Sequence, residues 1–316
     1  MGTNSLNKLL AIVCSVFDAY STVLFLPDKN SSEYILGAQF SLGNEIREDL
    51  RLAPGQGLVG WMIRNRKPLL INNFDRKRSR LGYYTGDEEL KVKAFMGCPL
   101  KTGEGALCVD SRRSYNFSDK ELKILDMFSG LACDISDGLT QVEQDLVEHR
   151  FYRSLQQIQG LRRQCPHWSV FLKAFLEIVS EATRFPVCFL AARDERGEGY
   201  FIEGSSQEIF DAKSLERKYS MKSGLVGWVF SNRQAVCSGE SVCSAVGQTL
   251  LGKDAALPLC KTFICLPLLI HKKARGVLVL AHPEAMEINC ATKGFAEMAT
   301  DHLTLFLENL YLKSRI

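Results

Sequence analysis

The sequence predicts an α+β protein built from two copies of one domain, each an antiparallel sheet flanked by helices on both faces, with a long helix joining the copies. The length of 316 residues fits two domains of about 150 residues each. A composition of 46% hydrophobic and 24% charged residues is typical of a globular protein. The motif Gly57-Leu58-Val59-Gly60-Trp61 recurs as Gly224-Leu225-Val226-Gly227-Trp228. Five identical residues that include a tryptophan indicate a tandem duplication.

Further matches follow the motif in the same order in both halves. They are Asn65-Arg66 and Asn232-Arg233, Pro99-Leu100 and Pro267-Leu268, and Gly105-Ala106-Leu107 and Gly276-Val277-Leu278. The spacing between them changes by only a few residues, so the two copies share one order of elements.

Each copy begins with an amphipathic helix, because apolar residues recur there at helical spacing. Two short strands bounded by turn-forming residues come next. We expect these three elements at residues 6–17, 21–26 and 34–40 in the first copy and at residues 168–182, 186–192 and 200–203 in the second.

The repeated motif then starts a short helix that ends near Asn65 or Asn232, and a brief strand and a long irregular segment follow it. Two apolar strands joined by a turn that contains glycine close each sheet as a hairpin, and a long helix ends each copy. The brief strands are expected at 68–71 and 235–238, and the closing strands at 94–100, 106–109, 263–270 and 276–281.

The helix between the copies carries an apolar seam. Ser118 is a plausible N-cap with Glu121 three residues on. Steps of three and four residues then connect Leu125, Phe128, Ala132, Ile135, Leu139, Val142 and Leu146, and the seam continues through Phe151, Leu155 and Ile158. Packing on its own domain explains the first part, whereas the part from Leu139 to Ile158 predicts a parallel homodimer. The expected domains are residues 1–138 and 167–316, with 139–166 as a helical linker continuous with the last helix of the first domain.

At these motifs the chain resembles the GAF domain family, relatives of PAS domains that act as sensors of small molecules and signals. The repeated glycine motif, the Pro-Leu strand and the Gly-Ala/Val-Leu strand before a terminal helix carry the resemblance over nearly the whole chain. The resemblance implies a ligand cavity over one face of each sheet, roofed by the irregular segment. The signature of cyclic-nucleotide-binding members is not reproduced, because Asp110-Ser111 and Ala281-His282 stand where it begins.

The family geometry implies which residues line the two cavities. They are Phe74, Phe95 and Cys98 in the first copy and Cys237, Cys243 and Phe263 in the second. The repeated Trp61 and Trp228 are expected in the core, where an aromatic ring would hold the short helix on the sheet, rather than in contact with a ligand. Another possibility is that side chains fill one or both cavities and that the domains serve only for contact with other proteins.

Cysteines of the second copy give an alternative. Cys237, Cys243, Cys260 and Cys265 lie on or beside the segment expected to roof the cavity, and thiolates bind zinc or iron–sulfur clusters. Their spacing matches no standard metal signature, so a redox or metal sensor remains an alternative. Some GAF proteins reduce free methionine-R-sulfoxide with pocket cysteines, but the acidic residues of that family are not evident here.

The sequence contains no phosphate-binding glycine loop, nucleophile elbow or kinase motif set. A net charge of +3, from 39 basic and 36 acidic residues, disfavours nucleic-acid binding. No apolar stretch is long enough to span a membrane, and eleven cysteines without paired spacing indicate a reducing compartment. We therefore expect a cytoplasmic, non-catalytic, homodimeric sensor or adaptor with an unknown ligand and cofactor, whose output resides in a separate protein.

Overall fold

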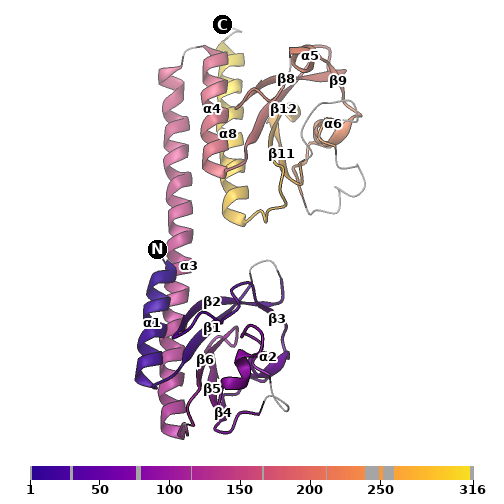
Figure 1. Ribbon diagram of the computed structural model, residues 1–316. Helices are drawn as coiled ribbons and strands as arrows, with labels where there is room; N and C mark the ends of the chain where they lie inside the picture. Colours follow the sequence, from indigo (N-terminus) through magenta and orange to yellow (C-terminus); the bar gives the residue numbers. More distant parts are fainter. Residues whose placement is uncertain are drawn as a thin grey trace. The chain divides into compact units, whose positions relative to one another are not determined.

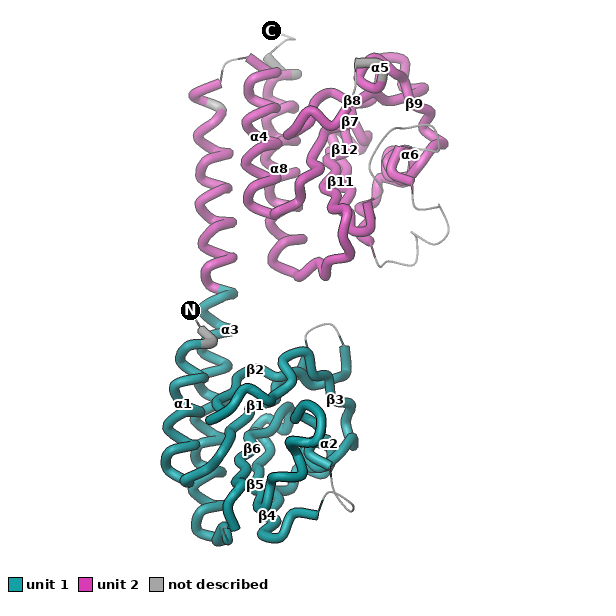
Figure 2. The backbone as a smooth tube through the Cα atoms, in the orientation of Figure 1, with its two compact units in different colours: residues 1–144 teal, residues 145–316 magenta. Residues whose placement is uncertain are grey.

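The computed structural model describes residues 2–28, 31–75, 80–114, 116–165, 167–210, 212–238, 249–251 and 260–313. The chain forms two compact units, residues 1–144 and 145–316 (Figure 2). Each unit is built around its own antiparallel sheet of six strands.

The first unit contains helices α1 and α2, a short 3-10 helix, six strands and the first half of helix α3 (Figure 1). In chain order these are α1 (Gly2–Val16), β1 (Ser21–Pro27), β2 (Tyr34–Ser41), β3 (Arg51–Leu52), α2 (Gly57–Asn65), β4 (Leu69–Ile71), η1 (Glu88–Lys91), β5 (Ala94–Pro99), β6 (Ala106–Ser111) and α3 (Asp119–Gln164).

The sheet of the first unit has the strand order β3-β2-β1-β6-β5-β4. Its two faces carry different cores, because successive side chains of a strand point to opposite faces. Leu24 packs on the face covered by α1 and α3, which we call the helix side. Val23 and Phe25 pack on the opposite face, which carries α2 and which we call the roof side.

The second unit repeats this arrangement. Its elements are α4 (Trp168–Thr183), β7 (Val187–Arg193), β8 (Gly199–Ser205), α5 (Ala212–Glu216), β9 (Tyr219–Ser220), α6 (Gly224–Asn232), β10 (Val236–Cys237), β11 (Thr262–Ile270), β12 (Lys273–His282) and α8 (Cys290–Lys313). The strand order β9-β8-β7-β12-β11-β10 is that of the first sheet. Helices α4 and α8 lie on its helix side, and α6 lies on its roof side (Figure 1).

Helix α3 begins with the expected capping box. The backbone N–H of Ser118 donates to Oε2 of Glu121 at 2.7 Å, and the backbone N–H of Glu121 donates to Oγ of Ser118 at 3.3 Å. These bonds satisfy two of the amide donors that the first turn of a helix leaves without partners.

The apolar seam of α3 is divided between the two units. Its first five members, from Leu125 to Leu139, pack in the helix-side core of the first unit. Phe151, Leu155 and Ile158 pack in the helix-side core of the second unit. The units therefore divide within the helix, after Gln144, at a point inside the expected linker of residues 139–166.

Helices long and apolar enough to cross a bilayer are absent from the part of the chain that the structure describes.

Candidate functional site

The repeated Gly-Leu-Val-Gly-Trp motif shapes the roof side of each unit. Gly57 and Gly224 have φ angles of 63° and 68°, a left-handed conformation that glycine adopts without steric cost. A Cβ atom on Gly60 would lie 2.7 Å from the carbonyl oxygen of Ala53. A Cβ atom on Gly227 would lie 2.6 Å from the carbonyl oxygen of Met221. Both glycines of the motif are therefore required by the backbone of the short helix.

The motif also holds the irregular segment that connects β4 to β5 in the first unit and β10 to β11 in the second, which we call the roof segment. The backbone N–H of Leu58 donates to the carbonyl of Arg80 at 2.9 Å. In the second unit the N–H of Leu225 donates to the carbonyl of Thr249 at 3.0 Å. Because Leu58 and Leu225 are equivalent in the repeat, the same helix start holds the roof segment in both units.

A buried carboxyl group lies on the roof side of the first unit. Asp110 is fully buried near the end of β6 and accepts hydrogen bonds from three hydroxyl groups. Tyr84 donates to Oδ1 at 2.7 Å, Tyr83 donates to Oδ2 at 2.8 Å, and Ser21 also donates to Oδ2. Such a network supplies the partners that a buried carboxyl group needs.

Burial raises the pKa of Asp110 from its ordinary value of 3.8 to about 6. Desolvation is the largest cause, and it outweighs the hydrogen bonds from Ser21, Tyr84 and Tyr83, which lower the pKa. Desolvation beside this carboxyl group raises the pKa of both tyrosines. Asp110 therefore takes up a proton at a higher pH than an exposed aspartate does.

A second polar group borders this cluster. The guanidinium carbon of Arg112 lies 3.6 Å from the ring centroid of Tyr20. Arg112 donates to Oε2 of Glu88 at 3.0 Å, and the Tyr20 hydroxyl donates to Glu45 at 3.1 Å. Together, the Asp110 cluster and the residues around Arg112 connect β1, β6, η1 and the roof segment.

The roof side of the second unit is apolar at the matching position. Ser21 pairs with Asp110 in the first sheet, whereas Val187 pairs with Ala281 in the second. Both members of the second pair are buried. Among the residues that the structure describes, the second unit therefore has no counterpart of the Asp110 carboxyl group at this strand pair, although the repeat preserves the strands.

The structure places five of the six residues expected to line the cavities, and these five do not share one face of their sheets. Phe74 and Phe95 lie on the roof side of the first unit, and Phe263 lies on the roof side of the second. Cys98 and Cys237 lie on the helix sides, so the structure does not bring them together with the phenylalanines. Cys243 lies outside the described residues.

The four cysteines of the metal alternative do not share one face. Cys260 and Cys265 pack on the roof side of the second sheet. Cys237 pairs with Ile264 in the ladder, and its side chain packs on the helix side. With Cys243 outside the described residues, three of these positions are known, and one of the three is turned away from the other two.

The prediction that both repeated tryptophans lie in the core is wrong for Trp61, which is 41% exposed. The next two residues of α2, Met62 and Ile63, fill the core in its place. Trp228 is half-buried against the roof-side core of its unit.

Sequence reasoning missed the carboxyl cluster. Tyr83 and Tyr84 lie in the irregular segment, where no periodic pattern indicates which side chains point inward. The signal that was available is the acidic Asp110 at the end of an otherwise apolar strand.

Comparison with known proteins supports the fold. Residues 4–134 match the model of the GAF domain family. A crystal structure of bacteriophytochrome RpBphP3 from the photosynthetic bacterium R. palustris is similar over 97% of this chain and 72% of its own, with a TM-score of 0.54 and 9% identity. This likeness concerns the fold alone.

Two further solved structures are similar over part of the chain. The GAF domain of an Acinetobacter phosphoenolpyruvate-protein phosphotransferase has a TM-score of 0.43 and 18% identity, covering 54% of this chain and 98% of its own. A free methionine-R-sulfoxide reductase from Neisseria meningitidis has a TM-score of 0.38 and 16% identity, covering 45% of this chain and 81% of its own. No curated protein sequence matches this chain significantly.

Proposed function

We propose that this chain, a tandem GAF-like protein, is a non-catalytic signalling protein that senses a small molecule or docks a partner protein, and that it acts as a homodimer. The match of residues 4–134 to the GAF domain family carries the proposal, because GAF domains are typical of signalling sensor proteins. The second unit, with the same strand order, supplies a second domain of this kind.

The environment of several cysteines supports a non-catalytic role. Burial raises the pKa of Cys98 to about 12, and it raises the pKa of Cys108 and Cys188 as well. The thiolate is the nucleophilic form of cysteine, so these buried thiols are poorly suited to reaction at neutral pH. This disfavours thiol-based reduction of methionine sulfoxide at these positions.

The roof side of the first unit is the proposed sensing site. Phe74 and Phe95 lie in its core, and the Asp110 cluster places polar hydrogen-bonding groups within the same apolar surroundings. Binding pockets combine apolar walls with a few polar groups in this way. In the second unit we propose Phe263 as the corresponding wall.

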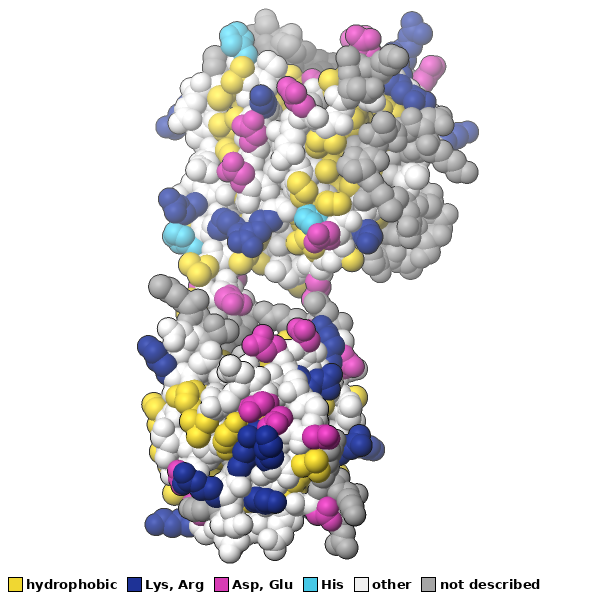
Figure 3. Space-filling model, viewed as in Figure 1, with side chains coloured by type: hydrophobic (Ala, Val, Ile, Leu, Met, Phe, Trp, Pro, Cys, Tyr) yellow, Lys and Arg dark blue, Asp and Glu magenta, His cyan; other side chains and the backbone are white. Residues whose placement is uncertain are grey.

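Exposed apolar side chains on the helices support the homodimer. Val142 and Leu146, one turn apart on α3, are 55% and 65% exposed. They are the members of the seam that neither unit buries. The helix layer of the first unit also exposes Ile12 on α1 and Met127 on α3. Figure 3 shows hydrophobic side chains, in yellow, on the part of the first unit where α1 lies in Figure 1. Burial of such side chains against a second copy would remove apolar surface from water.

Native mass spectrometry of the full chain, purified anaerobically, tests the proposal. A dimer that carries an organic mass supports sensing, and an empty dimer supports the partner-docking form. A monomer at micromolar concentration would contradict the homodimer. A metal-sized increment would instead return attention to the cysteines of the second unit.

A pair of matched variants separates dimer contact from general charge effects. We expect Val142→Glu with Leu146→Glu to shift the protein to the monomer. Gln141→Glu with Gln144→Glu adds the same two charges at exposed positions of the same helix segment, and we expect it to leave the dimer intact. Equal behaviour of the two variants would place the interface elsewhere.

A further inference from the structure

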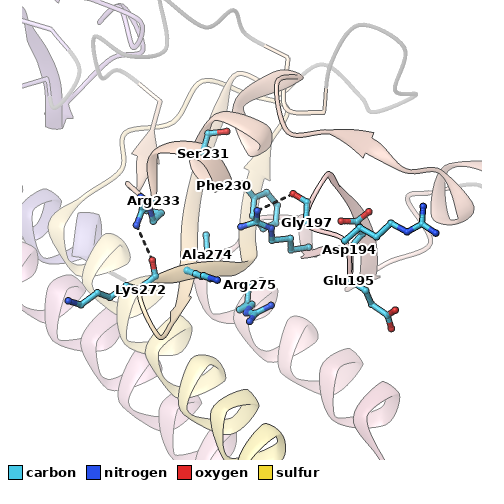
Figure 4. Close-up of a pocket in the computed structure, with 12 residues that line it drawn as sticks. Asp194, Glu195, Gly197, Phe230, Ser231, Arg233, Lys272, Ala274 and Arg275 are labelled. Carbon is cyan, nitrogen blue, oxygen red and sulfur yellow. Dashed lines mark hydrogen bonds between the residues drawn. The ribbon is translucent and has the colours of Figure 1, made fainter.

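A cavity of about 460 Å³ opens at one corner of the second unit, where Phe230 and Ala274 form the margin of the roof-side core. It is formed by the turn between β7 and β8, the end of α6, and the hairpin between β11 and β12 (Figure 4). A cavity of this size is in the range that holds a small organic molecule.

The lining of this cavity is strongly basic. Of its twelve lining residues, two are acidic and six are basic. The basic residues are Arg193, Arg196, Arg233, Lys272, Lys273 and Arg275. Within the described ranges, none of the six forms an ion pair with a carboxylate. No ion pair therefore offsets the mutual repulsion of these positive charges.

The acidic lining residues do not offset this charge. Asp194 accepts the backbone N–H groups of Glu198 at 2.9 Å and Gly199 at 3.2 Å. These backbone hydrogen bonds hold the pKa of Asp194 below its ordinary value. Asp194 and Glu195 lie at the β7–β8 end of the cavity, on the opposite side from Arg233 and Lys272 (Figure 4). The carboxylates therefore leave the other end of the cavity positive.

Two arginines are held in place by backbone carbonyls. Nη1 of Arg233 donates to the carbonyl of Lys272 at 3.1 Å, and Nη2 of Arg193 donates to the carbonyl of Gly197 at 3.0 Å (Figure 4). Each bond uses one of the five N–H donors of a guanidinium group. The remaining donors are free to bind an anion, and the fixed orientation reduces the entropy cost of binding it.

The first unit is an internal comparison. Arg66 is its counterpart of Arg233, and both residues follow the short helix in a left-handed conformation. The first hairpin carries Lys101 and Glu104 between its strands and is neutral. The second hairpin has longer strands and carries Lys272 in its turn and Lys273 and Arg275 at the start of β12, with no acidic residue. Because the same fold forms without this charge, the basic corner is not a requirement of the fold.

We propose that this corner of the second unit is a binding site for a small molecule that bears phosphate groups. Arginine forks match the geometry of phosphate oxygens, and several cations together favour an anion with more than one negative charge. Phe263, the wall proposed for sensing in this unit, is not among the residues that line the corner, so the corner is a separate site.

A second cavity adjoins the basic one. It has a volume of about 370 Å³, is lined in part by Trp168, Ile270 and Leu307, and shares Arg193 and Arg275 with the basic cavity. A ligand whose phosphate contacts these two arginines would have an apolar surface beside it. We therefore expect a phosphate ester of an apolar group to bind more tightly than inorganic phosphate compounds.

Isothermal titration calorimetry of the full chain tests the site with tripolyphosphate and 1-naphthyl phosphate as probes. We expect saturable binding of both, weakened by added salt. Tighter binding of the naphthyl ester would assign the site to an organic phosphate, and tighter binding of tripolyphosphate would assign it to inorganic polyphosphate. Absence of saturable binding of either probe at millimolar concentration would overturn the proposal.

Variants locate the binding. We expect Arg233→Gln with Arg275→Gln to weaken binding about tenfold or more, since loss of about 1.4 kcal/mol of binding free energy corresponds to a factor of ten. The matched control is Arg66→Gln with Lys101→Gln, which removes the same charge from the corresponding corner of the first unit and should leave affinity unchanged. An equal loss in both variants would indicate unspecific attraction to positive charge and would overturn the site. Thermal unfolding of each variant verifies that it is folded.

Discussion

The hydroxyl of Tyr84 donates a 2.7 Å hydrogen bond to Oδ1 of Asp110, and both residues are buried on the roof side of the first sheet. Tyr84 belongs to the roof segment and Asp110 to the central strand β6, so this bond ties the roof to the sheet. The hydroxyl of Ser21 on β1 lies 2.8 Å from that of Tyr84 and completes the connection.

The raised pKa of Asp110 predicts a pH dependence of the stability of the first unit. Its folded-state pKa of about 6 lies above the ordinary value of 3.8, so the folded state binds the proton more tightly. The resulting stabilisation is complete below the unfolded pKa and is lost as pH rises through the folded pKa. Its full size is on the order of 2–3 kcal/mol.

Asp110→Asn removes this term, because the amide does not titrate. Urea unfolding followed by NMR signals of β1 and β6 should show that wild type gains stability relative to the variant as pH falls from 7.5 to 4.5. A constant difference across this range would mean that Asp110 has an ordinary pKa in the folded state.

Tyr84→Phe tests a hydrogen bond that opposes the rise in the pKa of Asp110. The hydrogen bond from Tyr84 lowers the pKa of Asp110, so its removal should raise that pKa further. Carboxyl-carbon NMR titration of Asp110 in wild type and variant measures the change, and an unchanged or lower value would contradict the assigned contacts.

The sequence predicts the fold for identifiable reasons. The repeated glycine motif fixes the equivalence of the two halves, and the capping box of Ser118 and Glu121 fixes the start of α3. Both are local signals. The period of two along a strand, by contrast, argues against the expectation that Phe95 and Cys98 line one cavity, because residues three apart on β5 point to opposite faces.

Other features depend on contacts that local patterns do not encode. The opposite facing of Cys237 and Cys265 follows from the pairing of β10 with β11. The Asp110 cluster depends on how an irregular segment folds back over the sheet. The basic corner combines two turns and the end of α6, which are distant in sequence. Local sequence patterns therefore do not predict it, because the sheet has to form before these segments meet.

Glu89 is expected to stabilise the roof segment of the first unit. It is 6% exposed, and its carboxylate accepts the backbone N–H groups of Leu81 at 2.6 Å and Gly82 at 3.4 Å. Glu89→Ala would leave buried amide donors without their acceptor, which costs about 1–3 kcal/mol. Glu89→Gln keeps one acceptor oxygen and should recover part of the loss. Urea unfolding of the two variants measures both effects, and equal stability of Glu89→Ala and wild type would refute the role.

The glycines of the repeated motif predict matched losses of stability. A methyl group on Gly60 or Gly227 would meet a backbone carbonyl oxygen at 2.7 or 2.6 Å, so Gly60→Ala should destabilise the first unit and Gly227→Ala the second, by about 1–3 kcal/mol each. Gly138 on α3 has no atom within 4 Å of its added Cβ, and Gly138→Ala should stabilise the helix by about 1 kcal/mol. Differential scanning calorimetry resolves the three cases, and a stabilising effect at Gly60 or Gly227 would contradict the close approach.

Phe151 distinguishes packing within the second unit from contact with a partner. Its ring stacks on that of Phe295 with centroids 4.6 Å apart, and the two residues are 5% and 0% exposed. Phe151→Ala should therefore destabilise the second unit by about 3–5 kcal/mol through lost burial and the cavity left behind. The neighbouring Tyr152 is 60% exposed, so Tyr152→Ala on the same helix should cost little. Hydrogen exchange of α8 measures the stability, and size-exclusion chromatography with light scattering measures the mass. If Phe151→Ala instead leaves α8 protected and converts the protein to a monomer, this part of the seam belongs to the partner interface.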